Sequence, residues 1–319
     1  YLNGIGSSKP GQNAPTLLIH SQQAGTTLLE NLGRAARTKP KEIVGLPAFV
    51  IPFAVEHIAS TGIDLWFGAL SYGFGEVILL LSGDEDPGYR GALTEQADLA
   101  NSISQALGFG ERVRCIMASS SSDIDAVNQV MTELLTRKAQ KLMAPPASFA
   151  LAMQKRETLE MSLEHLLQFA PQVLPAEGIP LPAHSPLGAI AVNKDACTLC
   201  MSCVGACPEG ALLDNPDEPQ LSFIEKQCVQ CGLCEQTCPE SAITLSPRLS
   251  SIEQRKQKVL LNKTEPFHCI SCGKAFGTLK MVELMLGRIG THHAFSGEAL
   301  NRLKMCSDCR VVDMMKKEL

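Results

Sequence analysis

The chain has 319 residues, of which 45% are hydrophobic, and its formal net charge is -5. This length and apolar content are enough for two or three packed domains. No run of about 18 apolar residues occurs, which excludes a membrane-spanning helix and predicts a chain without a transmembrane segment. Twelve of the 13 cysteines lie beyond residue 190 in short C-x2-C units. That usage is typical of metal binding in a reducing compartment, so we expect a cytoplasmic protein.

The first half of the chain predicts an α/β domain. Residues 1–14 are rich in Gly, Ser, Pro and Asn, and we interpret them as a linker. Over residues 15–143, apolar strands alternate with amphipathic helices, which indicates a small parallel sheet covered by helices. The predicted strands cover residues 16–19, 42–45, 76–81 and 112–117. The predicted helices cover residues 26–37, 55–60, 65–72, 93–107 and 123–137.

This domain also carries a family resemblance. Its ordered motifs are Leu46-Pro47, Gly62-x-Asp64, Ala69-Leu70-x-x-Gly73, Gly83-Asp84, Leu107-Gly108 and Glu111-Arg112-Val113. They resemble the iron-sulfur D subunit of methyl-viologen-reducing hydrogenase, which links hydrogenase or formate dehydrogenase to heterodisulfide reductase in methanogens. That family carries a 2Fe-2S cluster on cysteines in the loops after its strands. The corresponding loops here, 20–27, 46–52 and 82–90, contain no cysteine. We therefore expect a degenerate domain that has lost its cluster, with a flavin or nucleotide site as an alternative.

Residues 144–186 predict a connector between domains. They begin with Ala144-Pro145-Pro146 and include an amphipathic helix over about 153–169. Five prolines then follow between residues 171 and 186, which favours a stiff, extended chain.

Residues 187–248 contain two copies of the spacing C-x2-C-x2-C-x3-C-P. In this pattern three thiolates bind one cube and the fourth binds the other. The first predicted 4Fe-4S cluster has the ligands Cys197, Cys200, Cys203 and Cys238. The second predicted 4Fe-4S cluster has the ligands Cys228, Cys231, Cys234 and Cys207. The module resembles the bacterial two-cluster ferredoxins, so we expect an α+β fold with outer strands at 189–192 and 242–245 and a middle strand at 221–224. Disulfides or two zinc sites are the disfavoured alternatives.

Residues 249–319 predict a small domain held by a metal, with a helix at 279–286. Two C-x2-C units supply the thiolates of Cys269, Cys272, Cys306 and Cys309. Four thiolates favour a structural, tetrahedral zinc site of the zinc-ribbon type, with rubredoxin-like iron as the alternative. This segment has 12 Lys and Arg against 7 Asp and Glu and no interleaved aromatic residues, so a nucleic-acid partner is not favoured.

As a whole, the chain resembles the C-terminal portion of the large 4Fe-4S proteins that accompany proteobacterial formate dehydrogenases. The resemblance lies in the eight cluster cysteines, in residues 266–274 (PFHCISCGK) and in residues 304–310 (KMCSDCR). It implies a cytoplasmic electron-transfer or accessory subunit whose redox partner is a molybdenum or tungsten formate dehydrogenase. We assign no catalytic residue and expect a non-catalytic component that relays single electrons. The alternatives are a redox-sensing regulatory or assembly factor and a flavin-containing oxidoreductase.

Overall fold

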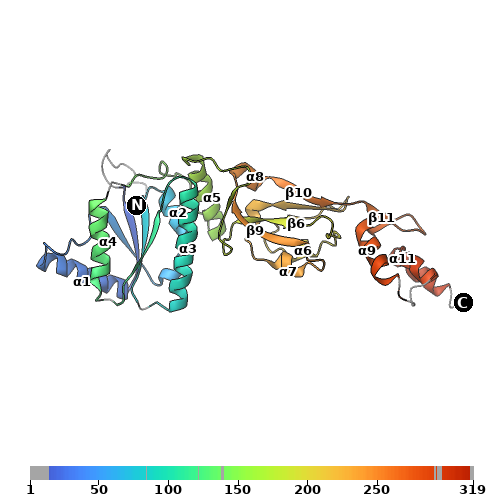
Figure 1. Cartoon of the computed structure of the whole chain (residues 1–319), viewed down its shortest axis with the longest axis horizontal. Coiled ribbons are helices and arrows are strands. Elements are labelled where there is room, and N and C mark those ends of the chain that lie inside the picture. Colours follow the sequence, from blue (N-terminus) through green and yellow to red (C-terminus); the bar gives the residue numbers. More distant parts are fainter. Residues whose placement is uncertain are drawn as a thin grey trace. The chain divides into compact units, whose positions relative to one another are not determined.

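The computed structural model describes residues 14–83, 85–120, 122–137, 140–290, 292 and 297–316. The chain divides into two compact units, Tyr1–Ile179 and Pro180–Leu319, which we describe separately (Figure 1). The predicted linker lies outside the described residues except for Ala14, and so does Asp84 of the hydrogenase-like motif. None of the described helices combines the length and the apolarity that crossing a bilayer would require.

The first unit is built on a four-stranded parallel sheet with the order β2-β1-β3-β4. Its strands are β1 (Thr16–Ser21), β2 (Val50–Val55), β3 (Glu76–Leu81) and β4 (Val113–Met117). All six residues of β3 are buried, because this central strand has a neighbour on each edge and helices on both faces. The predicted α/β fold with a small parallel sheet is confirmed.

Helices cover both faces of this sheet (Figure 1). One core combines Leu18 and Ile78 of the sheet with Leu28 of α1 and Met131 of α4. Side chains alternate along a strand, so the neighbouring sheet residues face α2 and α3 on the opposite side. The helices of this unit are α1 (Ala24–Thr38), α2 (Ile63–Ser71), α3 (Pro87–Ala106), α4 (Ile124–Thr136) and α5 (Lys155–Gln168).

Two predicted elements of the first unit are wrong. Residues 42–45 form no strand, and the second strand of the sheet is β2, which begins at Val50. Ile43 is buried in the core, but Gly45 has a φ of +70° and ends any extended run there. The predicted helix at 55–60 is replaced by the end of β2 and a short 3-10 helix, Ile58–Ser60. Pro52 is tolerated in β2 because β2 is an edge strand and the missing N–H faces no neighbour.

Helix α5 belongs to the first unit rather than to a free connector. It packs against α2 and buries Leu159, Leu163 and Leu166. The Ser71 hydroxyl of α2 donates to the carbonyl oxygen of Ser162 at 3.4 Å. The helix predicted within residues 144–186 is present as α5, and it lies in the compact unit that ends at Ile179.

Two small antiparallel sheets precede the C-terminal hairpin in the second unit. In one, β6 pairs with β9, with Ile190 opposite Leu245. In the other, β8 lies between β7 and β10. The strands are β5 (Ile179–Pro180, at the boundary of the units), β6 (Gly188–Val192), β7 (Leu212–Leu213), β8 (Gln220–Ile224), β9 (Ile243–Leu249) and β10 (Lys258–Lys263).

The predicted middle strand at 221–224 is present as β8, but its place in the sheet differs from the prediction. The two outer strands β6 and β9 pair directly with each other, so nothing lies between them. Only the six residues between Leu213 and Gln220 separate β7 from β8. Such a short connection favours a local hairpin over insertion between two distant strands.

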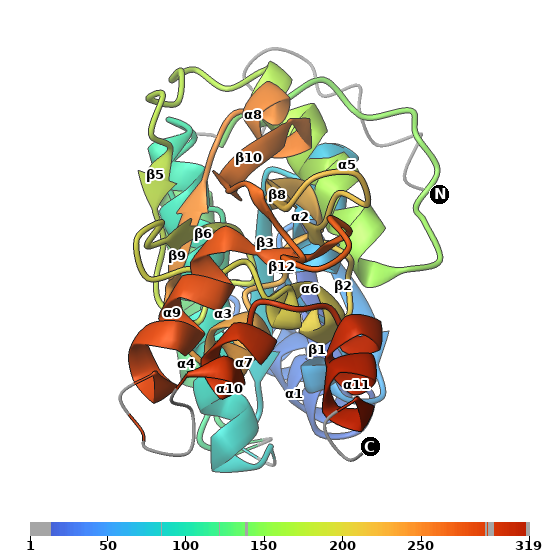
Figure 2. The same cartoon turned by 90° about the vertical axis from the view of Figure 1, so that its right-hand side faces the viewer.

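Short helices and a second hairpin complete this unit. The helical turns near the cysteine motifs are α6 (Ser202–Ala206), η3 (Glu225–Gln227), α7 (Leu233–Thr237) and α8 (Ile252–Lys256). The C-terminal segment has the hairpin β11 (Pro266–His268) and β12 (Ala275–Thr278), followed by α9 (Leu279–Ile289), α10 (Glu298–Arg302) and α11 (Ser307–Met315). Figure 2 shows these last helices from a second side. Helix α9 covers the helix predicted at 279–286 and continues to Ile289.

Candidate metal centres

A first cavity brings together four of the predicted cluster ligands. Cys197 and Cys200 lie in the loop that leads into α6, and Cys203 lies within that helix. The fourth cysteine of this cavity, Cys238, ends the other short helix, α7. All four residues line the same cavity, together with Leu199.

A second cavity repeats this arrangement with the roles of the two motifs exchanged. Cys228 and Cys231 precede α7, Cys234 lies within it, and Cys207 ends α6. These four cysteines line one cavity. Helices α6 and α7 pack against each other, so each presents its terminal cysteine to the cavity of its neighbour. The structure therefore groups the eight cysteines in the two predicted sets, and their role as cluster ligands stays a prediction.

The backbone explains how closely spaced cysteines face one cavity. Leu199 and Met201 in the first loop, and Gln230 and Gly232 in the second, all have positive φ angles, between 55° and 78°. These left-handed turns curl the chain so that successive cysteines point inward. The positions match at an offset of 31 residues, so the repeat seen in the sequence is also a repeat of backbone conformation.

Backbone N–H groups also point at the terminal cysteine of each motif. The amide of Ala211 donates to Cys207 Sγ, and the amide of Ala242 donates to Cys238 Sγ, both at 3.3 Å. Such bonds stabilise negative charge on sulfur, which is the state that a metal ligand requires.

The electrostatics of both cavities fit a positively charged inorganic group. Burial, followed by the neighbouring cysteines, raises the pKa of Cys203 to about 12 and that of Cys234 to about 11. Four thiols this close to one another in an apolar core cannot all ionise on their own, because burial and like charge both oppose it. Metal ions supply the compensating charge, so the donor set fits an iron-sulfur cluster.

Gln230 and Ser202 are among the polar side chains that contact cysteine sulfurs, and the motif spacing predicted neither contact. Gln230 Nε2 lies 3.2 Å from Cys228 Sγ, and Ser202 Oγ lies 3.4 Å from Cys200 Sγ. The repeat in the sequence could have pointed to Gln230. At the offset of 31 residues, Gln230 corresponds to Leu199, so the two halves differ in polarity at this position.

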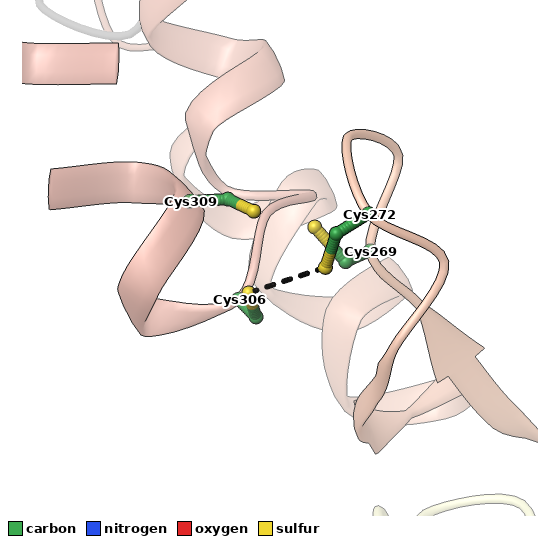
Figure 3. Close-up of side chains that lie close together, drawn as sticks. All are labelled: Cys269, Cys272, Cys306 and Cys309. Atoms are coloured by element: carbon green, nitrogen blue, oxygen red, sulfur yellow. Dashed lines mark hydrogen bonds between the residues drawn. The ribbon is translucent and has the colours of Figure 1, made fainter. Parts of the chain in front are cut away.

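The C-terminal segment brings four more cysteines together (Figure 3). Cys269 and Cys272 lie in the turn between β11 and β12, which Gly273 closes with a φ of +75°. Cys306 caps the N-terminus of α11, and Cys309 lies in its first turn. The four sulfur atoms all lie within 4.8 Å of one another, although the two pairs are far apart in the sequence.

The spacing of these sulfurs fits a single metal ion. Cys272 Sγ lies 3.7 Å from Cys306 Sγ. A tetrahedral zinc with bonds of about 2.3 Å to sulfur separates its thiolates by about 3.8 Å. A cube of four irons would spread the ligands further, because each thiolate binds a different iron atom.

The thiols of this site are not equivalent in the absence of a metal. Burial opposes the ionisation of Cys269, but bonds from the backbone amides of Cys306, Cys272 and Ser271 lower its pKa to about 6. For Cys309, a hydrogen bond with Ser271 lowers the pKa, but interactions with Cys272 and Cys306 outweigh it and raise the pKa to about 12. One thiolate thus forms readily and opposes the ionisation of its neighbours, so a bound cation is needed for four thiolates.

The first unit has a cavity of about 620 Å³ at the carboxyl ends of β1, β2 and β3, where ligands bind in open α/β sheets. Its polar lining includes Ser21, Gln23, Glu56, His57, Ser60, Glu85, Asp86 and Tyr89. Three carboxylates in this lining oppose the binding of a phosphate, so the cavity does not favour a nucleotide or flavin phosphate. The remaining cysteine, Cys115, lies in β4.

Comparison with known proteins supports the interpretation of the two cysteine-lined cavities. Two family models, each described as a 4Fe-4S dicluster domain, match residues 189–239 and residues 227–277. A search of curated proteins found no significant match. The first match contains both cysteine motifs in full. The second unit therefore contains a ferredoxin-type iron-sulfur module, and the predicted class, an electron-transfer iron-sulfur protein, is supported. The second match also includes Cys269 and Cys272, whose sulfurs converge with those of Cys306 and Cys309.

Proposed function

We propose that the protein relays single electrons through two 4Fe-4S clusters. One cluster has the ligands Cys197, Cys200, Cys203 and Cys238, and the other has Cys228, Cys231, Cys234 and Cys207. The observation that carries the proposal is the exchange of the fourth cysteine between the two cavities. This exchange is the arrangement expected of paired cubes.

The protein's own residues hold and insulate the clusters rather than perform substrate chemistry. When bound, the clusters supply reversible one-electron transfer. Cys203 and Cys234 are buried, whereas Cys200 and Cys231 are exposed. Each cavity thus has one cysteine at the protein surface, where a redox partner can approach closely. We assign no catalytic residue.

A structural zinc ion at Cys269, Cys272, Cys306 and Cys309 is the second part of the proposal. Four protein thiolates leave no open position for a substrate or water, which is typical of structural zinc. The metal would hold the β11–β12 turn against the start of α11. Rubredoxin-like iron is the competing metal, and metal analysis distinguishes the two.

The role of each domain and the identity of the redox partner are also proposals. Residues 15–143 would form a docking scaffold that resembles the hydrogenase D subunit, residues 187–248 would hold the clusters, and residues 249–319 would hold zinc. The redox partner would be a molybdenum or tungsten formate dehydrogenase in the cytoplasm. The sequence resemblance at residues 266–274 and 304–310 supports this partner.

Two double variants test the exchanged ligand sets. Cys197→Ala with Cys238→Ala removes two ligands from one proposed cluster, whereas Cys197→Ala with Cys207→Ala removes one ligand from each. We expect about eight irons per chain in the anaerobically purified parent and about four in the first variant. The first variant should keep one cluster that dithionite reduces, with the electron paramagnetic resonance signal of an isolated cube. The second variant should lose or alter both clusters.

Cys115→Ala is the matched control, because Cys115 lies in β4 and belongs to neither cavity. This control should keep the parental iron content and both clusters. If the double variant at Cys197 and Cys207 keeps one intact cluster and the other double variant keeps none, the ligand sets are not exchanged. A parent with fewer than about four irons, or with clusters that dithionite does not reduce, would reject the relay.

A further inference from the structure

The side chain of Gln230 makes two hydrogen bonds beside the second cavity. Its Nε2 donates to Cys228 Sγ at 3.2 Å and to the carbonyl oxygen of Ala189 at 2.8 Å. Gln230 is half-buried and lines the cavity, so water competes for these bonds less than it would at the surface. The bond to sulfur is therefore partly shielded from water, and it stabilises negative charge on the Cys228 thiolate.

The orientation of the Gln230 amide is determined by its surroundings. If the amide were reversed, its oxygen would lie 2.8 Å from the oxygen of Ala189, and two acceptors would face each other. Gly188, just before Ala189 in β6, provides the space for the amide. A Cβ atom at residue 188 would lie only 2.7 Å from Gln230 Cδ.

The other half of the repeat has no such donor at the equivalent position. Leu199 stands there, with a φ of 56° against 55° at Gln230, so both residues have the same left-handed φ and differ in their side chains. Leu199 is buried, with 4% of its surface exposed, and it lines the first cavity with apolar atoms. The two cavities are therefore alike in cysteines and backbone but unlike in polarity beside one ligand.

We propose that Gln230 raises the reduction potential of the cluster at Cys207, Cys228, Cys231 and Cys234 above that of the other cluster. The inference rests on the proposed function. Reduction adds one electron, and thus one negative charge, to a cluster and its thiolates. An N–H donor to a ligand sulfur stabilises that added charge, so the reduced state becomes more favourable. The first electron taken up would then reside on the cluster beside Gln230.

The polar contacts in the first cavity are weaker in their effect. The side chains of Ser202, 3.4 Å from Cys200 Sγ, and Thr198 both hydrogen-bond Cys200, but Cys200 is exposed, so these bonds largely replace bonds to water. Cys228 is half-buried.

The charges beside the two cavities also differ. Glu240 of the first cavity forms an ion pair with Arg288 at 2.6 Å, and the equivalent Glu209 of the second cavity is exposed. Arg288 is 61% exposed, so water and salt screen this pair. The difference in charge therefore has only a weak effect on the two reduction potentials.

Anaerobic redox titrations followed by electron paramagnetic resonance test the proposal with paired variants. Gln230→Met keeps the length of the side chain without its donor. Gln230→Leu copies the residue that the other half of the repeat carries in the same backbone conformation. We expect each variant to lower one of the two midpoint potentials. The ratio of reduced to oxidised cluster at a given potential should fall about tenfold, which is 59 mV for one electron.

Gln129→Met is the matched control, because it makes the same exchange at an exposed residue of α4 that lines neither cavity, and it should leave both midpoints in place. A variant at Gln230 that keeps its full iron content and both parental midpoints overturns the inference but leaves the relay intact. If the upper of the two parental midpoints stays and the lower one falls, the proposed order of the potentials is wrong. A parent without two reducible clusters rejects the relay itself, and the inference with it.

Discussion

The Thr278 hydroxyl donates to the backbone carbonyl oxygen of Thr198 at 2.7 Å. Thr198 lies in the first cysteine loop, between Cys197 and Cys200, and Thr278 ends β12. The same hydroxyl oxygen accepts a hydrogen bond from the amide of Met281 at 3.1 Å and caps α9. One buried side chain therefore joins the C-terminal hairpin, the helix that follows it and a wall of the first cavity.

Replacement of Thr278 by Val should destabilise the second unit. The variant keeps the shape of the side chain but loses the cap of α9 and the bond to Thr198, each of which is worth about 1 kcal/mol. We expect a loss of about 2 kcal/mol in the free energy of unfolding, measured by anaerobic denaturant unfolding of the iron-loaded protein. Thr278→Ser retains the hydroxyl and should lose less than half as much. Equal losses in the two variants would show that the hydroxyl is not responsible.

Removal of the metal from the four-cysteine site should release α11 without emptying the cluster cavities. No residue of α11 is buried, and Val311, Val312 and Met315 are more than half exposed. The ion pair between Arg302 and Asp313, at 2.7 Å, links α10 to α11, but partly exposed pairs contribute only about 1 kcal/mol or less. Zinc binding, by contrast, supplies on the order of 10 kcal/mol to small thiolate domains.

A chelator, or the variant Cys272→Ser, should therefore accelerate amide hydrogen exchange across residues 307–315. The iron and sulfide contents of the protein should stay at the parental level. Cys115→Ser provides the matched control for the loss of a thiol and should leave exchange in α11 unchanged. Protection of α11 that survives complete loss of the metal contradicts a structural role for the site.

The Cys115 thiol should react slowly and should make folding stability depend on pH. Burial, with a smaller contribution from the charge of Asp98, raises its pKa from 9.0 to about 11. At pH 8 its thiolate fraction is then about one hundredth of that of an ordinary thiol. Alkylation of Cys115 in the iron-loaded protein, followed by mass spectrometry of its peptide, should accelerate as the pH approaches 11.

The same raised pKa of Cys115 makes the folded protein less stable as the pH rises. Above pH 9 the unfolded chain loses the Cys115 proton while the folded protein retains it, so the stability from this group falls between about pH 9 and pH 11. The difference in unfolding free energy between the parent and Cys115→Ala should therefore shrink over this range. A difference that is constant from pH 8 to pH 11, with rapid alkylation at pH 8, would falsify the raised pKa.

Local sequence was sufficient to predict a ferredoxin-type iron-sulfur module and the α/β class of the first unit. The two C-x2-C-x2-C-x3-C-P motifs predict iron-sulfur binding because ligand spacing within a tight loop is a local property. Strand Glu76–Leu81 was likewise predictable, since a short run of apolar residues between polar ones indicates a buried strand. These signals depend on neighbours in the chain and need no knowledge of distant contacts.

Pairing between distant segments was decided only by the tertiary structure. Apolar residues in β8 indicate burial, but they do not say whether the strand pairs with β6, β7 or β10. The strand at Val50–Val55 was missed because Pro52 weakens its local signal, while its place at the sheet edge removes the penalty. The contact between Gln230 and Cys228 requires a residue without a side chain at position 188, more than 40 residues earlier. Sequence periodicity indicates which side chains are buried, whereas packing and hydrogen-bond geometry across the fold determine which groups they contact.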